Sequence, residues 1–140
     1  MDFPDKEPLV QYDHTLRSRY SETDKMGYVY YGHYLAFFEE ARTEMIRNSG
    51  VSYRQLEDNG VMLPVIHSEI EYKAPVYYDE EVIIRVKVYD IPTIRLQTFY
   101  EVIAKERDQL CARGEVTLVF MKEDTRRPCR APDYFLKQFE

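Results

Sequence analysis

The chain has 140 residues, of which 44% are hydrophobic and 31% charged, a profile that excludes a disordered or fibrous protein and indicates one globular domain. Its 19 basic and 25 acidic side chains give a net charge of −6, which argues against a general nucleic-acid-binding protein. We therefore interpret residues 1–140 as a single domain, with a polar arm over residues 1–8 and a linker with a short helix over residues 123–140.

The N-terminal residues lack an apolar run, and no stretch of 18 apolar residues occurs. We therefore expect neither a signal peptide nor a membrane span, and a cytoplasmic chain. The two cysteines, Cys111 and Cys129, lack the spacing of a structural zinc site, so no metal is expected. Cys111 falls in an alternating pattern that predicts a buried free thiol.

The first half of the chain predicts one strand and one long helix. Alternating apolar and polar residues from Val10 indicate a half-buried strand that runs into a polar loop, Ser21–Gly27. Apolar residues at three- and four-residue steps then predict a helix from about Tyr31 to Asn48. Within it, Glu39 and Arg42 have the spacing of a surface ion pair. Leu35 and Phe37 widen the apolar face of this predicted helix.

A second, short helix is predicted from Ser52 to about Asp58, and the second half of the chain is mostly strand. Alternation predicts four further strands, at Leu63–Ala74, Val82–Val88, Thr93–Lys105 and Leu110–Met121. Pro132 opens a possible terminal helix to Phe139. One long apolar helix among consecutive strands predicts an α+β domain whose helix lies across an antiparallel sheet. The other face and the edges of such a sheet favour self-association.

Polar residues gather in one place, between the first strand and the long helix. Asp24 lies in this loop, just before backbone N–H groups that have no partner within the helix. Such groups polarise a carbonyl oxygen bound near them, and a nearby carboxylate can attack the carbonyl carbon or activate a water. From the residues alone, an aspartate at this position is also the ordinary choice for a helix cap or a turn.

The motif around Asp24 resembles the signature of the 4-hydroxybenzoyl-CoA thioesterase family of hotdog-fold proteins. It reads Arg19-Tyr20-x3-Asp24-x2-Gly27-x-Val29-Tyr30-Tyr31-x2-Tyr34-Leu35-x2-Phe38-Glu39-x-Ala41-Arg42. The later segments Glu71–Pro75 and Tyr78–Glu80 are similar to the same family's second strand and its following turn. The resemblance implies a hotdog fold, in which a curved antiparallel five-stranded sheet wraps a long central helix.

The resemblance also implies roles for particular residues. Asp24 stands where the family has its catalytic carboxylate, a nucleophile or a general base. The backbone N–H of Tyr31 matches the group that polarises the thioester carbonyl, and Tyr20 matches a tyrosine of related acyl-CoA thioesterases. Those relatives often carry a histidine where this chain has Tyr31, and His33 follows two positions later.

Three other residues are expected to contact the substrate together with His33. His67, in the second predicted strand, has a position that could line the pocket, although a hydrogen-bonded structural histidine is an equal alternative. Lys73 and Arg95 are candidate partners for the phosphates of coenzyme A. For both cations the alternative is a solvated strand face.

The implied function is hydrolysis of an acyl-CoA or acyl-carrier thioester to a carboxylate and a free thiol, with coenzyme A as part of the substrate and no resident cofactor. The resemblance implies a homodimer or homotetramer with the site across a subunit boundary. Two other functions stay open: a non-catalytic module that binds such thioesters, and an enoyl-thioester hydratase that would need Asp24 and His33 as a pair.

Overall fold

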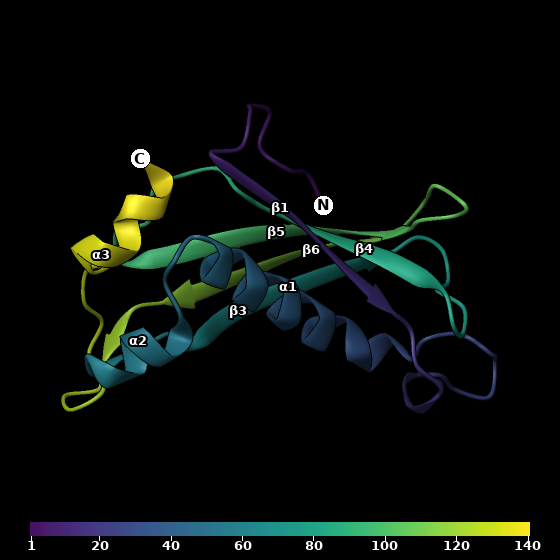
Figure 1. The fold of residues 1–140 in the computed structure, drawn as a ribbon, viewed down its shortest axis with the longest axis horizontal. Helices are drawn as coiled ribbons and strands as arrows, with labels where there is room; N and C mark the ends of the chain where they lie inside the picture. The colour runs from purple at the N-terminus through teal and green to yellow at the C-terminus, as the bar shows by residue number, and fades with distance from the viewer.

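The computed structural model describes all residues, 1–140. The helix α1 and the long strands β5 and β6 dominate Figure 1. The helices and strands in chain order are β1 (Val10–Arg17), η1 (Tyr20–Glu22), η2 (Tyr31–His33), α1 (Tyr34–Asn48), α2 (Tyr53–Asp58), β2 (Val61–Met62), β3 (Val65–Tyr72), β4 (Glu81–Val88), β5 (Arg95–Ala104), β6 (Gln109–Val119), β7 (Met121–Lys122), α3 (Asp133–Leu136) and η3 (Lys137–Phe139).

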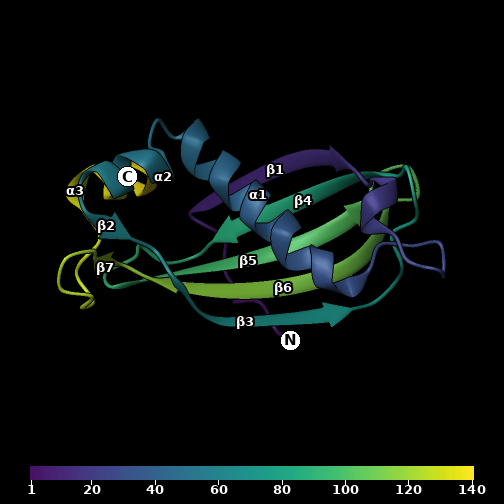
Figure 2. The ribbon, with the colours of Figure 1, turned by 90° about the horizontal axis from the view of Figure 1, so that it is seen from below.

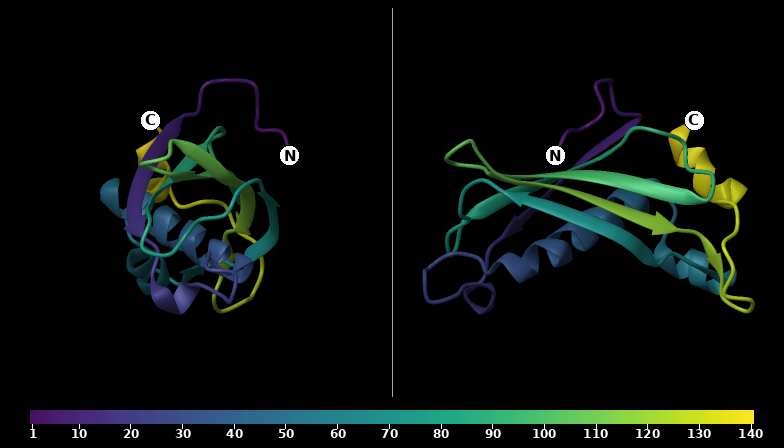
Figure 3. Two further views of the ribbon diagram at one scale, coloured as in Figure 1. Left: turned by 90° about the vertical axis from the view of Figure 1, so that its right-hand side faces the viewer. Right: turned by 180° about the vertical axis from the view of Figure 1, so that it is seen from behind.

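Five strands form one antiparallel sheet in the order β1-β4-β5-β6-β3. Figure 2 shows α1 lying across one face of this sheet, and the end-on view of Figure 3 shows the strands curving around the helix. This arrangement confirms the α+β class and the five strands predicted from alternation. The strands β1 and β3 lie at the two edges, so β3 has no partner on its outer side.

The side chains of β4 show how alternation builds the core. Val82, Ile84, Val86 and Val88 are fully buried under the helix, whereas the residues between them are only half-buried, as the period of two requires. The helix contributes its own buried face, made of Tyr34, Phe37, Phe38, Ala41, Met45 and Ile46. Leu35, expected to widen this face, is instead 44% exposed.

Phe38 makes a tight contact between α1 and the strands β5 and β6. Its ring stacks on the ring of Tyr100 in β5, with 4.3 Å between centroids and 14° between planes. Its edge lies over Gly114 of β6, where a Cβ atom would be only 2.3 Å from a Phe38 ring carbon. Gly114 therefore lets the helix sit close to the sheet at this point.

The predicted surface ion pair between Glu39 and Arg42 is wrong. Arg42 is only 5% exposed, and it donates hydrogen bonds to the Tyr53 hydroxyl at 2.8 Å and the Tyr100 hydroxyl at 3.0 Å. Residues three or four apart on a helix share one face, so Arg42 faces the same side of α1 as the buried residues Phe38 and Met45. Arg42 therefore joins α1 to α2 and β5 from within.

The N-terminal arm lies on the face of the sheet opposite α1 (Figure 3). Phe3 packs on Phe99 of β5 with 5.1 Å between ring centroids, and the Arg113 guanidinium lies 4.0 Å over the Phe3 ring. The arm thus covers part of the outer face that was expected to be exposed. No helix of the chain is both long enough and apolar enough to cross a bilayer.

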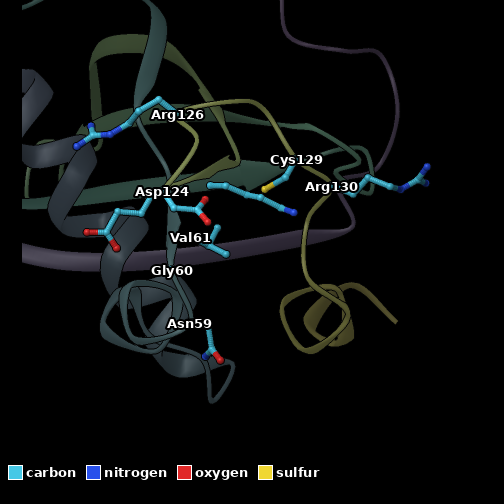
Figure 4. Close-up of a pocket in the computed structure, with 9 residues that line it drawn as sticks. Asn59, Gly60, Val61, Asp124, Arg126, Cys129 and Arg130 are labelled. Atoms are coloured by element: carbon cyan, nitrogen blue, oxygen red, sulfur yellow. The ribbon is translucent and has the colours of Figure 1, made fainter.

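The predicted terminal helix is present as α3 and η3, and the segment that leads into it lies beside the start of β5, where the Ala131 N–H donates to the Thr93 carbonyl. Phe135 of α3 packs edge-on against Phe120 at 5.1 Å. A hollow of about 830 Å³ opens next to it, between the α2–β2 turn and Cys129 (Figure 4). Arg126 and Arg130 at its rim point in opposite directions in Figure 4, so they do not converge on a common ligand position.

Replacing Gly114 with alanine tests the close approach of α1. Because the new methyl group would collide with Phe38, we expect the free energy of unfolding to fall by about 1–3 kcal/mol. Urea denaturation followed by circular dichroism measures this change. Ser68→Ala, on the exposed edge strand β3, is the control and should leave stability within about 0.5 kcal/mol. Equal stability of the two variants would contradict the packing described here.

The two thiols differ in reactivity. Cys111 is fully buried, and burial raises the pKa of its thiol, whereas Cys129 is half-buried and faces the hollow of Figure 4. Because the thiolate is the reacting form, a thiol reagent should label Cys129 first in the native protein. Mass spectrometry of the labelled peptides reads this order. Both thiols should react in urea, and prior labelling of Cys111 in the native state would contradict the assignment.

Candidate active site

The loop between β1 and α1 holds Asp24 in a tight turn. Asp24 Oδ1 accepts the backbone N–H of Met26 at 2.8 Å, and the Asp24 carbonyl accepts the N–H of Gly27 at 3.1 Å. Gly27 has φ +83°, a conformation that favours glycine. The second carboxylate oxygen, Oδ2, accepts no hydrogen bond from the protein and is available to a ligand or a water.

Glu22 fixes the same loop from inside. Its side chain is 8% exposed and accepts the Arg19 backbone N–H at 2.8 Å and the Arg19 guanidinium at 3.2 Å. Its carbonyl accepts the N–H of Tyr30 at 2.8 Å. No sequence pattern indicated this role, because Arg19 has no side-chain acceptor for a capping box and the Glu22 N–H donates instead to the Arg19 carbonyl at 2.9 Å.

The long helix begins with the 3₁₀ turn η2, whose first residue is Tyr31. As the first residue of the turn, Tyr31 has no acceptor within the helix for its backbone N–H. A bridge between Thr23 and Val29 closes the loop, so Asp24 and the start of η2 meet at one hollow. The carbonyl of Tyr31 in turn accepts the Tyr72 hydroxyl at 3.2 Å.

This hollow has a volume of about 390 Å³ and is mostly apolar, since seven of its ten lining residues are hydrophobic. Its lining is Asp24, Met26, Tyr28, Val29, Tyr31, Tyr34, Tyr72, Lys73, Ala74 and Pro75. The ring of Tyr72 meets those of Tyr31 and Tyr34 edge-on, at 6.2 and 5.2 Å between centroids. Tyrosine rings thus form much of the wall.

Tyr34 is the most buried of these tyrosines, at 3% exposure. Burial raises the pKa of its phenol to about 12. At neutral pH the group therefore stays protonated and keeps a hydrogen to donate. The pKa of the Tyr72 phenol is also raised, first by burial and then by Tyr31.

A second hollow, of about 670 Å³, lies on the other side of Asp24. It is lined by Tyr20, Thr23, Asp24, Lys25, Gly27 and Tyr78. The rings of Tyr20 and Tyr78 meet edge-on at 5.7 Å, and Tyr20 is 79% exposed. Asp24 is the one residue that lines both hollows.

The structure brings together four of the seven residues predicted for the site. Asp24, Tyr31 and Lys73 line the apolar hollow, and Tyr20 joins Asp24 at the second one. The ammonium group of Lys73 binds Glu71 Oε1 at 2.5 Å. The three tyrosines Tyr28, Tyr34 and Tyr72 were not predicted to line the site. The sequence signals for them are the excess of tyrosine, 13 residues in a chain with no tryptophan, and the presence of Tyr34 and Tyr72 in the two segments that resemble the family.

His33 lies elsewhere. Its ring packs edge-on against Tyr30 at 6.0 Å, and it lines neither hollow beside Asp24. Two positions around a helical turn carry its side chain away from that of Tyr31. A catalytic pair of Asp24 and His33, which the hydratase hypothesis requires, is therefore not formed in this structure.

His67 and Arg95 lie away from the two hollows beside Asp24, so their expected contact with the substrate stays a prediction. Gly114 faces Phe38 of the helix, so its neighbour Glu115 faces the opposite side of the sheet. His67 lies 3.4 Å from Glu115 and shares that outer face. Arg95 lines a separate hollow on the outer face, with Phe99. Strand alternation alone does not say which of the two sets of residues faces the helix.

The family model of the thioesterase-like superfamily matches residues 18–139. YbgC of Escherichia coli O157:H7, an acyl-CoA thioester hydrolase, is 30% identical over 125 residues, which are 89% of this chain and 92% of YbgC. YneP of Bacillus subtilis (strain 168) is 40% identical over 72 residues, or 51% of this chain. The match spans only about half of YneP, 52% of its length.

Among solved structures, a DHNA-CoA thioesterase from Staphylococcus aureus is similar to this chain. Its sequence is 35% identical, with a TM-score of 0.81 over 86% of this chain and 80% of that chain. Together with the curved sheet around α1, this likeness confirms the hotdog fold. The chain belongs to the thioesterase-like superfamily.

Proposed function

We propose that this protein is an acyl-CoA thioesterase, which hydrolyses an acyl or aroyl thioester to free coenzyme A and a carboxylate. The observation that carries the proposal is the position of Asp24, which lines both the tyrosine-walled apolar hollow and the second hollow beside Tyr20 and Tyr78. A thioester likewise extends in two directions from its carbonyl carbon, with an acyl group on one side and a long thiol carrier on the other. Membership of the thioesterase-like superfamily supports it.

In this proposal the acyl group enters the tyrosine-lined hollow and the thiol carrier lies along Tyr20 and Tyr78. The thioester carbonyl oxygen accepts the backbone N–H of Tyr31, which stabilises the negative charge that develops on that oxygen. The positive end of the helix adds to the effect. The tyrosine walls are compatible with an aromatic acyl group, as in the 4-hydroxybenzoyl-CoA thioesterase family that the Asp24 motif resembles.

Asp24 acts in one of two ways. As a nucleophile, its carboxylate attacks the carbonyl carbon, the C–S bond breaks, and water then hydrolyses the mixed anhydride. As a general base, it removes a proton from a water that attacks the same carbon. Either route ends with a carboxylate and a thiol, and the exposed Tyr20 hydroxyl is placed on the side where the departing sulfur takes up a proton.

Lys73 lies at the wall of the hollow that takes the acyl group in this proposal, and its ammonium binds Glu71. Its predicted role as a partner for the phosphates of coenzyme A therefore stays a prediction. His33 and Arg95 line neither hollow beside Asp24, so their contact with the substrate stays a prediction.

The active form in this proposal is a homodimer, with a homotetramer built from it as the larger predicted assembly. The edge strand β3 has no partner on one side, and its first residues Val65 and Ile66 are 51% and 49% exposed. A second copy can add its own β3 antiparallel to this edge. Tyr72 ends the same strand and lines the apolar hollow, so a partner paired there would adjoin the site.

Replacing Asp24 with asparagine tests the catalytic role. Asparagine keeps the size but removes the charge, so we expect thiol release from acyl-CoA substrates to fall by about 100-fold or more. The assay is thiol release from a panel of aryl and aliphatic acyl-CoAs. Asp108→Asn, in the β5–β6 turn and outside both hollows beside Asp24, is the matched control and should keep wild-type activity.

The panel also separates the other functions. A binding module would gain thermal stability with coenzyme A ligands but release no thiol, and a hydratase would change the ultraviolet absorbance of an enoyl-CoA. Equal activities of the Asp24→Asn and Asp108→Asn variants would contradict the role of Asp24.

Placing a charge on the free edge tests the assembly. We expect Ile66→Lys to convert the dimer to monomer in sedimentation velocity, because a lysine on an edge strand opposes strand addition. Activity should fall with dissociation if the partner adjoins the site. Lys105→Glu, at the far end of the β5–β6 hairpin, is the control. A wild-type chain that sediments as a monomer would contradict the proposed dimer.

A further inference from the structure

Three potential metal ligands meet on the outer face of the sheet, away from Asp24. His67 Nε2 lies 3.4 Å from Glu115 Oε2 and 3.8 Å from Glu69 Oε2. All three ligand atoms lie within 4.8 Å of one another. They come from two neighbouring strands, β3 and β6, and none belongs to the site described above.

The sheet register places two negative charges directly opposite each other at this point. Glu69 of β3 pairs with Glu115 of β6, and His67 pairs with the next outward residue of β6, Thr117. Like charges directly opposite in a sheet are destabilising. The cost is raised because Glu115 is only 5% exposed, so water does little to screen its charge.

No lysine or arginine side chain forms an ion pair with Glu69 or Glu115. The pKa of the Met1 ammonium is raised mainly by Glu71, which it binds, and to a lesser extent by Glu69. Glu115 Oε1 accepts the Thr117 hydroxyl, and Oε2 has His67 as its only polar neighbour within ion-pair distance. The cations around the cluster bind other groups. The Met1 ammonium and Lys73 both bind Glu71, Arg113 contacts Phe3 and the Met1 carbonyl, and Lys87 pairs with Glu101.

We propose that His67, Glu69 and Glu115 bind a divalent transition-metal ion, with Zn²⁺ the best match to one imidazole and two carboxylates. Zinc bonds of about 2.0–2.1 Å place the ligand atoms of a tetrahedron roughly 3.3 Å apart. The separations of 3.4 and 3.8 Å from the imidazole nitrogen are near that value. Glu69 is 58% exposed at its side chain and can rotate to close the remaining gap.

The surroundings leave room for a fourth ligand. A hollow of about 520 Å³ adjoins the cluster, between the N-terminal arm and the strands. Its lining includes Asp2, Gln97 and the three proposed ligands, so a bound water would meet polar groups. The ion would tie the edge strand β3 to β6, which makes its role structural and independent of the chemistry at Asp24.

Calorimetric titration of the chelator-treated, full-length protein with zinc chloride tests the proposal. We expect one Zn²⁺ per chain, with a Kd of about 10 μM or lower, and a higher melting temperature in excess zinc. Glu115→Gln and His67→Asn should each weaken binding by at least about 30-fold, since each removes a ligand. His67 is 59% exposed at its side chain, so its variant folds even if the buried one does not.

The control is His14→Asn, which removes the other histidine–carboxylate contact of the chain, between His14 Nε2 and Glu40 Oε2 at 2.6 Å. It should bind zinc as the wild type does. Absence of saturable binding up to millimolar zinc would overturn the proposal. Binding that survives in both His67→Asn and Glu115→Gln would also overturn it, as it would show an adventitious ion only.

Discussion

The contact of Phe38 with Tyr100 and Gly114 is the constraint on which the rest of the structure depends. It fixes how closely α1 packs on β5 and β6. The Phe38 ring stacks on Tyr100 with 4.3 Å between centroids, and it leaves no space for a side chain at position 114. One turn earlier, Tyr34 is buried against Tyr72. The start of the helix, and with it the N–H of Tyr31, is therefore held at one end of the sheet.

The loop that carries Asp24 is built onto this fixed helix start. Buried Glu22 holds it from inside through Arg19 and Tyr30, and Gly27 closes the turn that orients the carboxylate. A catalytic group must be held by its neighbours to act with little reorganisation. The apolar hollow is walled by tyrosines of α1 and β3, whereas the second hollow is lined by residues of the β1–α1 and β3–β4 connections, including Tyr20 and Tyr78.

The order of the helices and strands could be predicted from the sequence, because periodicity depends on residues near one another in the chain. The Asp24 loop and the helix start at Tyr31 were located by the same local signals and by the family motif. The partners of these residues were not. Tyr72 reaches Tyr31 from 41 positions away, and Tyr100 reaches Arg42 from 58 positions away.

The same reason explains why the sequence could not place His67 and Arg95 relative to Asp24. Alternation places each on a face, but only the packing of Phe38 on Gly114 decides which face meets the helix. The outer face then receives a set of charges that no single segment reveals, since Glu69 and Glu115 become neighbours only through strand register. A metal site made from two strands has no spacing signature in the sequence.

The most direct test is a crystal structure with a non-hydrolysable acyl-CoA analogue in which a methylene group replaces the thioester sulfur. The account predicts that the carbonyl oxygen lies within hydrogen-bond distance of the Tyr31 N–H, about 2.7–3.2 Å. The acyl group should fill the hollow of Tyr31, Tyr34 and Tyr72. An acyl group bound on the outer face of the sheet, or a carbonyl out of reach of both Tyr31 and Asp24, would contradict it.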